Sequence, residues 1–239
     1  MKTFVYGKNT VREAIRSGAA VRLLTLGHYE SDSIVKEALK ANIPVLFCND
    51  SELTKCAKNT GHQGFIAEIN GFDEYSVNDL IEVGKQRENP LILILDGIED
   101  PHNLGAILRS ADAFGVDGII MKKRGEVPLN STVAKVSTGA IHYVRTAVVP
   151  NISAAIATLK RNGYWIVASD GSGAMSYMDV DYRGPIALIV GSEGFGISKL
   201  VLRNSDFVVK IPMEGHVNSL NASVATGILL AGVAIVRRK

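Results

Sequence analysis

The sequence predicts an α/β protein in which a small domain precedes a larger one built on a parallel sheet. Apolar, strand-like runs alternate with helical segments along most of the chain, which is typical of α/β folds. Residues 91–95 form a continuous apolar run without alternation, as expected of a strand covered on both faces of a parallel sheet. Acidic residues outnumber basic ones between residues 71 and 89, which favours a linker there. We therefore expect domains at residues 1–70 and 90–239, joined by a linker at 71–89.

The small domain is predicted from its hydrophobic periodicity. Its first helical segment ends at Gly18, and Gly61-His-Gln-Gly64 makes a turn into its last strand. The predicted helices cover residues 9–17, 33–41 and 51–59, and the predicted strands cover residues 21–26, 43–48 and 65–69.

Basic residues are concentrated near the start of the chain. Lys8, Arg12 and Arg16 follow one another at roughly helical spacing, with Glu13 as the acidic residue among them. A solvated helix face explains this pattern, and charge alone favours that explanation. The functional alternative is a patch that contacts the phosphates of a nucleic acid. We keep these three residues as candidate RNA-binding positions.

The larger domain continues the alternation. A short helix is expected at residues 77–83 within the linker, and a final apolar helix is expected to end at Val236. Ligands of open α/β sheets bind beyond the carboxyl ends of the strands, so the loops after these strands are where a site is expected. The predicted strands cover residues 91–95, 118–121, 144–149, 165–169, 186–190 and 207–211, and the other helices cover residues 103–114, 131–137, 152–162 and 198–204.

Composition narrows the class of protein. The formal net charge of +2 over 239 residues permits a nucleic-acid partner without requiring one. Cys48 and Cys56 lack the spacing and the neighbouring histidines of a zinc site, so we expect reduced thiols and no metal. The longest apolar run, residues 224–236, is shorter than the ~18 residues of a membrane span, and the first residues lack a signal-peptide core. We expect a cytoplasmic protein with no membrane association.

The first chemistry-bearing stretch follows the strand at residues 91–95. Asp100 or Asn103 is suited to cap the next helix. Arg109 emerges from an apolar part of that helix, with Asp112 as its local acidic neighbour. As a purely structural feature this is a capped helix with one surface arginine. Such an arginine also suits a phosphate or an oriented hydroxyl.

The second stretch is Gly191-Ser-Glu-Gly-Phe-Gly196, between a strand and a helix. Its spacing is G-x-x-G-x-G, whereas dinucleotide-binding loops have G-x-G-x-x-G. Glu193 would also place a negative charge where a pyrophosphate sits. A ligand without phosphates, or one with positive charge, would tolerate that carboxylate.

The third stretch follows Pro212, which ends the last strand because proline lacks the backbone N–H. Polar side chains then precede the final apolar helix, and helix capping explains one or two of them. More polar groups are present than one cap needs, which favours a site for a small polar ligand. These residues are Asn218, Ser219, Asn221 and Ser223.

Together the three stretches resemble the SpoU/TrmH family of RNA ribose 2′-O-methyltransferases, within the SPOUT superfamily. The resemblance rests on Asp100-Pro-His-Asn-Leu-Gly-Ala-Ile-Leu-Arg-Ser-Ala-Asp112, Ile189-Val-Gly-Ser-Glu-Gly-Phe-Gly196 and the segment from Ile211-Pro-Met to Ser219-Leu-Asn-Ala-Ser-Val-Ala225. Residues 1–70, which open with Tyr6-Gly-Lys-Asn-Thr-Val-Arg12, are similar to that family's L30e/L7Ae-like substrate-binding domain. The two-domain layout resembles the bacterial branch that modifies a guanosine of 23S ribosomal RNA.

The resemblance implies S-adenosylmethionine as cofactor, a trefoil knot in the C-terminal domain, and a homodimer with its active site at the subunit interface. It implies that the backbone of Gly191, Ile211 and Leu220 holds the adenine and ribose, and that Thr138, Gly139 and Met213 line the same pocket. The positions that match the RNA-binding or catalytic residues of the family are Asn103, Arg109, Glu193, Ser219 and Asn221.

The proton of the ribose hydroxyl has two candidate routes. The family proposal makes the equivalent of Arg109 the general base, but a guanidinium holds its proton at the pH values that proteins experience. The physical alternative is that Arg109 clamps the target phosphate, and that this phosphate or Glu193 accepts the proton. Arg109 is essential in either version.

Three other functions are alternatives to a methyltransferase of 23S ribosomal RNA. A nucleotide-dependent oxidoreductase lacks its dinucleotide fingerprint here. A non-enzymatic RNA-binding module leaves the three polar strand-end loops unexplained. A transfer RNA guanosine 2′-O-methyltransferase stays open, because the small domain favours ribosomal RNA only by analogy.

Overall fold

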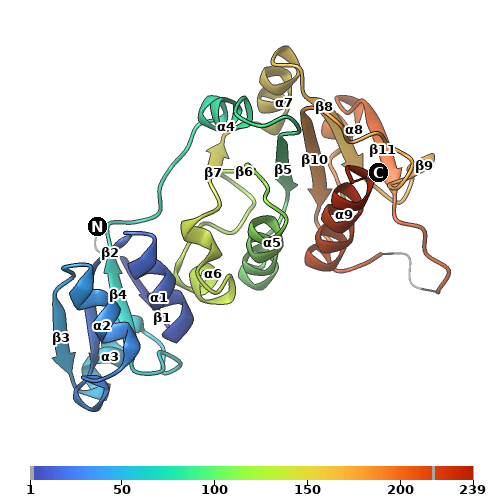
Figure 1. Cartoon of the computed structure of the whole chain (residues 1–239). Helices are drawn as coiled ribbons and strands as arrows, with labels where there is room; N and C mark the ends of the chain where they lie inside the picture. Colours follow the sequence, from blue (N-terminus) through green and yellow to red (C-terminus); the bar gives the residue numbers. More distant parts are fainter. Residues whose placement is uncertain (1–2, 217–218, 239) are drawn as a thin grey trace. The chain divides into compact units, whose positions relative to one another are not determined.

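The computed structural model describes residues 3–216 and 219–238, which form two compact units (Figure 1). The first unit contains Met1–Asp73 together with Leu129–Tyr143, and the second contains Glu74–Pro128 and Val144–Lys239. The predicted α/β class is confirmed. The inclusion of Leu129–Tyr143 in the first unit was not predicted from the sequence.

The first unit is built on a four-stranded sheet in the order β1-β4-β2-β3. The central strand β4 pairs antiparallel with both β1 and β2, whereas β2 and β3 are parallel. One apolar cluster packs Leu53 of α3 against Tyr6, Leu24 and Ile66 of the sheet. The elements are β1 (Thr3–Tyr6), α1 (Lys8–Arg16), β2 (Ala20–Leu26), α2 (Ser33–Lys40), β3 (Val45–Cys48), α3 (Asp50–Ala57) and β4 (Phe65–Ile69).

The short helix α6 (Ser131–Val136) belongs to the first unit because it packs on β1 and α1. The hydroxyl of Thr10 donates to the carbonyl of Ala134 at 3.3 Å, and the Lys135 ammonium donates to the carbonyl of Gly61 at 2.9 Å. These hydrogen bonds join residues more than seventy positions apart in the chain. Sequence periodicity, which is local, contains no signal for them.

The second unit is built on a seven-stranded parallel sheet in the order β7-β6-β5-β10-β8-β11-β9. All six residues of β5 are buried, as expected of a central strand covered on both faces. The strands are β5 (Leu91–Asp96), β6 (Gly118–Lys122), β7 (Thr146–Val149), β8 (Trp165–Ser169), β9 (Met175–Ser176), β10 (Ile186–Gly191) and β11 (Phe207–Lys210).

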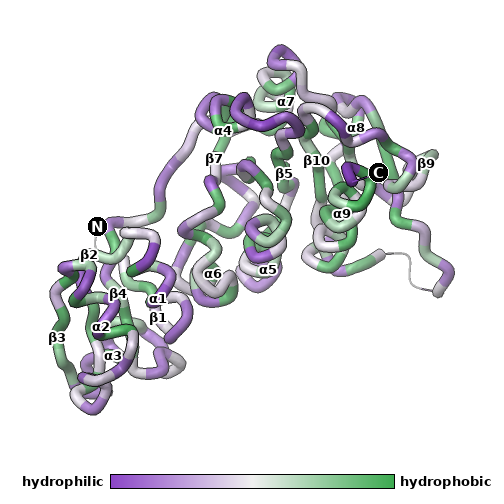
Figure 2. Tube along the Cα trace, in the orientation of Figure 1, coloured by the Kyte–Doolittle hydropathy of each residue, from purple (hydrophilic) through white to green (hydrophobic). Residues whose placement is uncertain are grey.

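The helices of this unit include α5 and α9, which pack against each other. Figure 2 shows hydrophobic residues along the central strands and along α9, whose composition is apolar on all sides. Among the described residues, no helix has both the length and the apolarity that crossing a bilayer requires. The helices are α4 (Val77–Gly84), α5 (Pro101–Ala113), α7 (Ile152–Arg161), α8 (Lys199–Arg203) and α9 (Ala222–Val236).

Candidate active site

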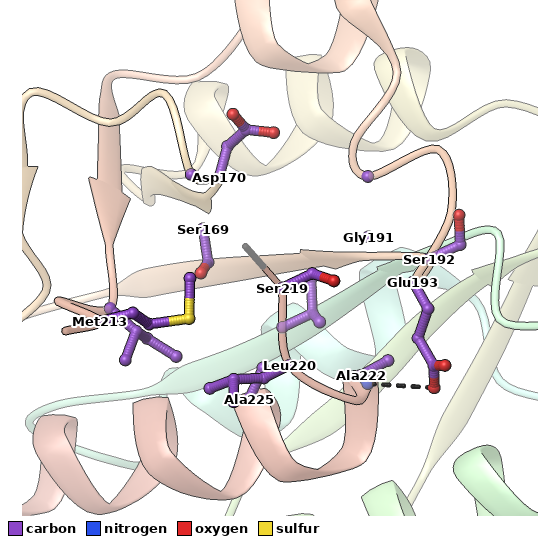
Figure 3. A pocket seen from close by; sticks show the side chains of 14 residues that line it. Ser169, Asp170, Gly191, Ser192, Glu193, Met213, Ser219, Leu220, Ala222 and Ala225 are labelled. Carbon is purple, nitrogen blue, oxygen red and sulfur yellow. Dashed lines mark hydrogen bonds between the residues drawn. The ribbon is translucent and has the colours of Figure 1, made fainter. Parts of the chain in front are cut away.

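The site lies in the second unit, at the carboxyl ends of neighbouring parallel strands. Strands β5, β10, β8 and β11 are adjacent in the sheet, so the loops that follow them meet at one edge. A pocket of about 690 Å³, counting the open space at its mouth, lies among three of these loops and the start of α9 (Figure 3). Its lining includes Ser169, Asp170, Gly171, Gly191, Ser192, Glu193, Ile211, Met213, Ser219, Leu220 and Ala225.

The lining of this first pocket combines apolar and polar groups without positive charge. Ile211, Met213 and Leu220 offer apolar surface suited to a flat ring, and Ser169 and Ser219 offer hydroxyls. No lysine, arginine or histidine occurs among the described residues that line it. The pocket therefore suits a neutral or cationic nucleoside better than a phosphorylated one.

Gly191 shapes this pocket by allowing two backbone segments to meet. A Cβ on Gly191 would lie 2.2 Å from the carbonyl carbon of Gly196, which is too close for any side chain. Ser192 and Gly196 exchange backbone hydrogen bonds of 3.2 and 3.0 Å across the same turn. The glycines of this loop thus serve a tight turn at the pocket wall rather than a pyrophosphate.

Beside the first pocket, three polar side chains form one hydrogen-bonded group: Asn103 from the first turn of α5, Glu193 from the loop after β10, and Asn221 from the cap of α9. The side-chain nitrogen of Asn103 donates to Glu193 Oε1 at 2.8 Å, and that of Asn221 donates to Asn103 Oδ1 at 2.8 Å and to Glu193 Oε1 at 2.5 Å. The backbone N–H of Ala222 also points at Glu193 Oε1, at 3.3 Å (Figure 3). The carboxylate of Glu193 is therefore fixed in orientation by three N–H donors.

This polar group lies on the wall of a second pocket, which shares Ser192, Glu193 and Ala222 with the first. The other walls come from the loop after β5, the start of α5 and the turn that carries Phe195, whose side chain is 96% exposed. Two neighbouring pockets that share one oriented carboxylate can hold two reactants side by side.

Helix caps position two members of the polar group. Asp100 caps α5 by accepting from the N–H of His102 at 2.8 Å, with Pro101 at the first helical position, which places Asn103 in the first turn. Asn221 caps α9 through its side-chain oxygen, which accepts from the N–H groups of Ser223 and Val224 at 3.0 and 3.2 Å. The capping and site interpretations of Asn221 therefore both hold.

Ionisable side chains next to Gly97, which lines the second pocket, connect the end of β5 to neighbouring segments. Asp96, at the end of β5, pairs with the Lys122 ammonium at 2.6 Å and accepts from the N–H of Ser198 at 2.9 Å. Burial opposes ionisation of Asp96, but these partners outweigh it and hold its pKa below the ordinary value. Glu126 accepts from the N–H groups of Gly97 and Lys122 at 2.8 and 2.9 Å, and burial raises its pKa to about 7.

Arg109 does not join this polar group within one chain. It lies on α5 six residues after Asn103, which is about 9 Å along the axis and about 120° around it. Its side chain is exposed, and within residues 3–216 and 219–238 it has no hydrogen-bond or ion-pair partner. Arg109 lines neither pocket.

Four of the six residues predicted to bind the cofactor line the first pocket, namely Gly191, Ile211, Met213 and Leu220. The predicted catalytic residue Ser219 lines it as well. Thr138 and Gly139 lie instead in the first unit, where Thr138 has a positive φ of 54° and Gly139 is packed against the Glu13 side chain. Neither is among the described lining residues of the two pockets. Asn218 lies outside the described residues.

Sequence reasoning missed the loop after β8, which contributes Ser169, Asp170 and Gly171 to the first pocket. The signal was available, because this loop follows a predicted strand of the same sheet and carries a carboxylate. The three predicted RNA-binding residues of the first unit are ion-paired: Lys8 contacts Asp32, and both Arg12 and Arg16 contact Glu37.

Two family profiles match the chain. The profile of the SpoU rRNA Methylase family matches residues 90–231, and the profile described as RNA 2′-O ribose methyltransferase substrate binding matches residues 4–75. A protein of Staphylococcus aureus strain COL, named as a TrmH family tRNA/rRNA methyltransferase, is 42% identical over 95% of this chain and 94% of its own length.

Solved structures show the same architecture. The SpoU methyltransferase AviRb from Streptomyces viridochromogenes, in complex with AdoMet, superposes with a TM-score of 0.85 at 26% identity, covering 100% of this chain and 91% of its own. An AdoMet-bound rRNA methyltransferase from Sinorhizobium meliloti shares the fold, with a TM-score of 0.82 at 24% identity over 98% and 87% of the two chains. With its two profiles, its polar strand-end loops and its fold in agreement, this chain belongs to the SpoU/TrmH family of RNA methyltransferases.

Proposed function

We propose that this protein transfers a methyl group from S-adenosylmethionine to the ribose 2′-hydroxyl of a guanosine in 23S ribosomal RNA. The observation that carries the proposal is the oriented carboxylate of Glu193 on the wall shared by two pockets, one of which suits a nucleoside without phosphates. The family profile and the AdoMet complex of AviRb support the same chemistry.

The first pocket is the proposed cofactor site. The apolar groups of Ile211, Met213 and Leu220 fit an adenine ring, the backbone of Gly191 allows close approach, and the lining lacks the cations that a phosphate would need. S-adenosylmethionine would supply an electrophilic methyl group there. The assignment of Thr138 and Gly139 to the same function remains a proposal.

The second pocket is the proposed site of the target ribose. Asn103 and Asn221 hold the Glu193 carboxylate through Oε1, which leaves Oε2 without a partner among the described residues. Oε2 can therefore accept a hydrogen bond from the 2′-hydroxyl and orient its oxygen for an in-line displacement. Ser219, which lines the neighbouring pocket, would orient a second hydroxyl.

Arg109 is the proposed phosphate clamp. Its guanidinium is exposed, unpaired among the described residues and separate from Asn103 on the same helix, and we propose that a second copy of the chain brings it to the pockets. The target phosphate held by Arg109, or Glu193, then accepts the hydroxyl proton.

A homodimer is therefore part of the proposal, and α9 carries a surface that fits it. Val224 and Ile235 are 50% and 49% exposed, and they lie eleven residues apart, which puts them on one helix face. Ile228 and Ala231 lie between them on that face and are half-buried. A continuous apolar stripe of this kind is typical of a subunit interface. The trefoil knot implied by the resemblance remains a prediction.

We also propose that residues 1–70 bind RNA, with Lys8, Arg12 and Arg16 as contacts, that residues 71–89 act as the linker, and that residues 90–239 catalyse transfer. The match of residues 4–75 to a substrate-binding profile supports the first assignment. An enzyme of ribosomal RNA acts where ribosomes are assembled, so we place it in the cytoplasm. Transfer RNA is the alternative substrate, because the Staphylococcus aureus relative is named for both RNAs.

The test is incubation with methyl-labelled S-adenosylmethionine and either undermodified 23S ribosomal RNA or transfer RNA. A 2′-O-methyl group makes the following phosphodiester resistant to alkali, so the resistant dinucleotides identify the nucleoside and can be mapped. Label in a 23S guanosine supports the full proposal. Label in transfer RNA alone would keep the reaction and reject the substrate, and label in a base would reject ribose methylation.

A further inference from the structure

The first pocket is negatively charged. Asp170 and Glu193 are the ionisable side chains among its described lining residues, and they reach it from different loops, after β8 and β10 respectively. Figure 3 shows them on different sides of the open space at the centre of the pocket, with Met213 and Leu220 on other sides. The two carboxylates differ in their hydrogen bonds. Glu193 Oε1 accepts three N–H groups, and these donors disperse its charge.

Asp170 lines the pocket and keeps one carboxylate oxygen without a hydrogen-bond partner among the described residues. Its Oδ1 accepts from the backbone N–H and the hydroxyl of Ser172, at 2.9 and 2.6 Å, which closes the turn after β8. Its Oδ2 has no hydrogen-bond partner among residues 3–216 and 219–238, and it would lie 3.4 Å from a Cβ built on Gly196, another lining residue. One oxygen therefore holds the loop, and the other presents negative charge to a ligand.

We propose that Asp170 makes the first pocket discriminate by charge between the sulfonium cofactor and its neutral thioether product. The inference rests on the proposed function, because it assumes that S-adenosylmethionine binds there. In the transfer, a lone pair of the ribose oxygen forms the bond to the methyl carbon, and the electrons of the broken carbon–sulfur bond stay on sulfur. Sulfur loses its positive charge, and the hydroxyl proton leaves to a base. The net charge of the bound molecule falls from +1 to zero.

Loss of that charge removes its attraction to Asp170. Opposite charges attract one another at a partly exposed site far more weakly than in a protein interior, so we expect an effect on affinity of roughly tenfold. The open Oδ2 thus favours exchange of spent product for fresh cofactor. A pocket that recognised only adenine, ribose and the amino-acid moiety would bind both molecules alike.

The test is calorimetry of the full-length protein without RNA, so that no readout depends on turnover. The variant is Asp170→Asn, which removes the charge but retains the Oδ1 acceptor that closes the turn with Ser172. Asp179→Asn is the matched control, because Asp179 is an exposed carboxylate of the same unit outside both pockets. The ligands are S-adenosylmethionine, S-adenosylhomocysteine and sinefungin, in which an amine carries the positive charge in place of sulfur.

We expect Asp170→Asn to weaken the binding of S-adenosylmethionine and sinefungin roughly tenfold and that of S-adenosylhomocysteine less than about twofold. Asp179→Asn should bind all three ligands with the affinity of the wild-type protein. Equal weakening of all three ligands would overturn the inference, since it would mean that Asp170 binds the amino group or a ribose hydroxyl. Unchanged binding of all three would also overturn it. If the wild-type protein binds none of them, the proposed function itself fails.

Discussion

The side-chain nitrogen of Asn221 donates to the carboxylate of Glu193, while the side-chain oxygen of Asn221 caps helix α9. One amide therefore fixes both the start of the last helix and the carboxylate on the wall of the two pockets. Because the cap needs only the oxygen and the site needs only the nitrogen, the two functions can be separated by mutation.

Asn221→Asp is expected to retain the cap and destroy the site. Aspartate caps helices as well as asparagine does, so we expect the free energy of unfolding to change by no more than about 1 kcal/mol. The new carboxylate cannot donate to Glu193 and repels it, so methyl transfer should fall by at least about 100-fold. Urea denaturation and label incorporation measure the two effects. Asn151→Asp is the control, since Asn151 caps α7 through the same oxygen and lines neither pocket. Activity close to wild type in Asn221→Asp would reject the proposed role of its nitrogen.

Arg109→Ala is expected to abolish transfer while binding of S-adenosylmethionine survives. In the proposed dimer, Arg109 and Glu193 of one active site come from different copies, so Arg109→Ala and Glu193→Gln should complement each other. After subunit exchange, half the dimers are mixed, and each has one intact site, so about a quarter of wild-type activity should return. No recovery, with mixed dimers verified by mass spectrometry, would place both residues in one chain's site or reject one of them.

Gly191→Ala is expected to disrupt the first pocket. The added Cβ meets backbone atoms of Gly196 and Ile197, which cannot rotate away, so the turn must open. We expect a loss of stability of about 1–3 kcal/mol and loss of cofactor binding by calorimetry. Gly171→Ala is the matched control in the same pocket, because a Cβ there meets nothing within 4 Å and its φ is not positive. If Gly191→Ala binds the cofactor normally, the close approach does not shape the pocket.

Much of the fold could be predicted from sequence where apolar runs end at glycine or proline. The predicted strands at residues 65–69 and 165–169 coincide with β4 and β8. Strand β1 was missed because it has four residues and is held by pairing with β4, whose partner residues lie sixty or more positions away. The packing of Leu129–Tyr143 into the first unit is equally long-range. Such contacts have no periodicity in a local window.

The candidate site, like the fold, was predictable in part from the sequence. The meeting of Asn103, Glu193 and Asn221 could be predicted because parallel strands end at one edge of a sheet and place their loops together. The position of Asp170 after a predicted strand of the same sheet was a signal, but a weak one, because a carboxylate among serine and glycine also describes an ordinary solvated turn. The separation of Arg109 from Asn103 follows from helix geometry once α5 is known.

Replacing Lys8, Arg12 and Arg16 together by alanine tests the proposed RNA contacts. If each meets a phosphate, the slope of log Kd for ribosomal RNA against log salt should fall by about 2, and affinity should drop at low salt. The control set consists of basic residues of the second unit that are also ion-paired: Lys85, Lys160 and Arg183. An unchanged slope in the first set would mean that these side chains only form the intramolecular pairs with Asp32 and Glu37.

Glu126 is expected to make stability depend on pH around neutrality. Burial raises the pKa of Glu126 to about 7 against its ordinary 4.5, despite the N–H groups of Gly97 and Lys122 and the Lys122 charge, and Asp96 adds to the rise. The folded protein therefore binds this proton more tightly than the unfolded chain does. Its stabilising contribution is complete below about pH 4.5 and is lost as the pH rises to about 7, by up to about 3 kcal/mol.

Glu126→Gln removes this titration and keeps a neutral group of the same shape. The difference in unfolding free energy, wild type minus Glu126→Gln, should therefore decrease between about pH 4.5 and 7 and become constant above it, as measured by urea denaturation at several pH values. Asp181→Asn, an exposed carboxylate paired with Arg183, should leave that profile unchanged over the same interval. A difference that does not vary with pH would mean that Glu126 is ionised over this whole interval in the folded protein. The N–H of Gly97 would then donate to a carboxylate that is always charged.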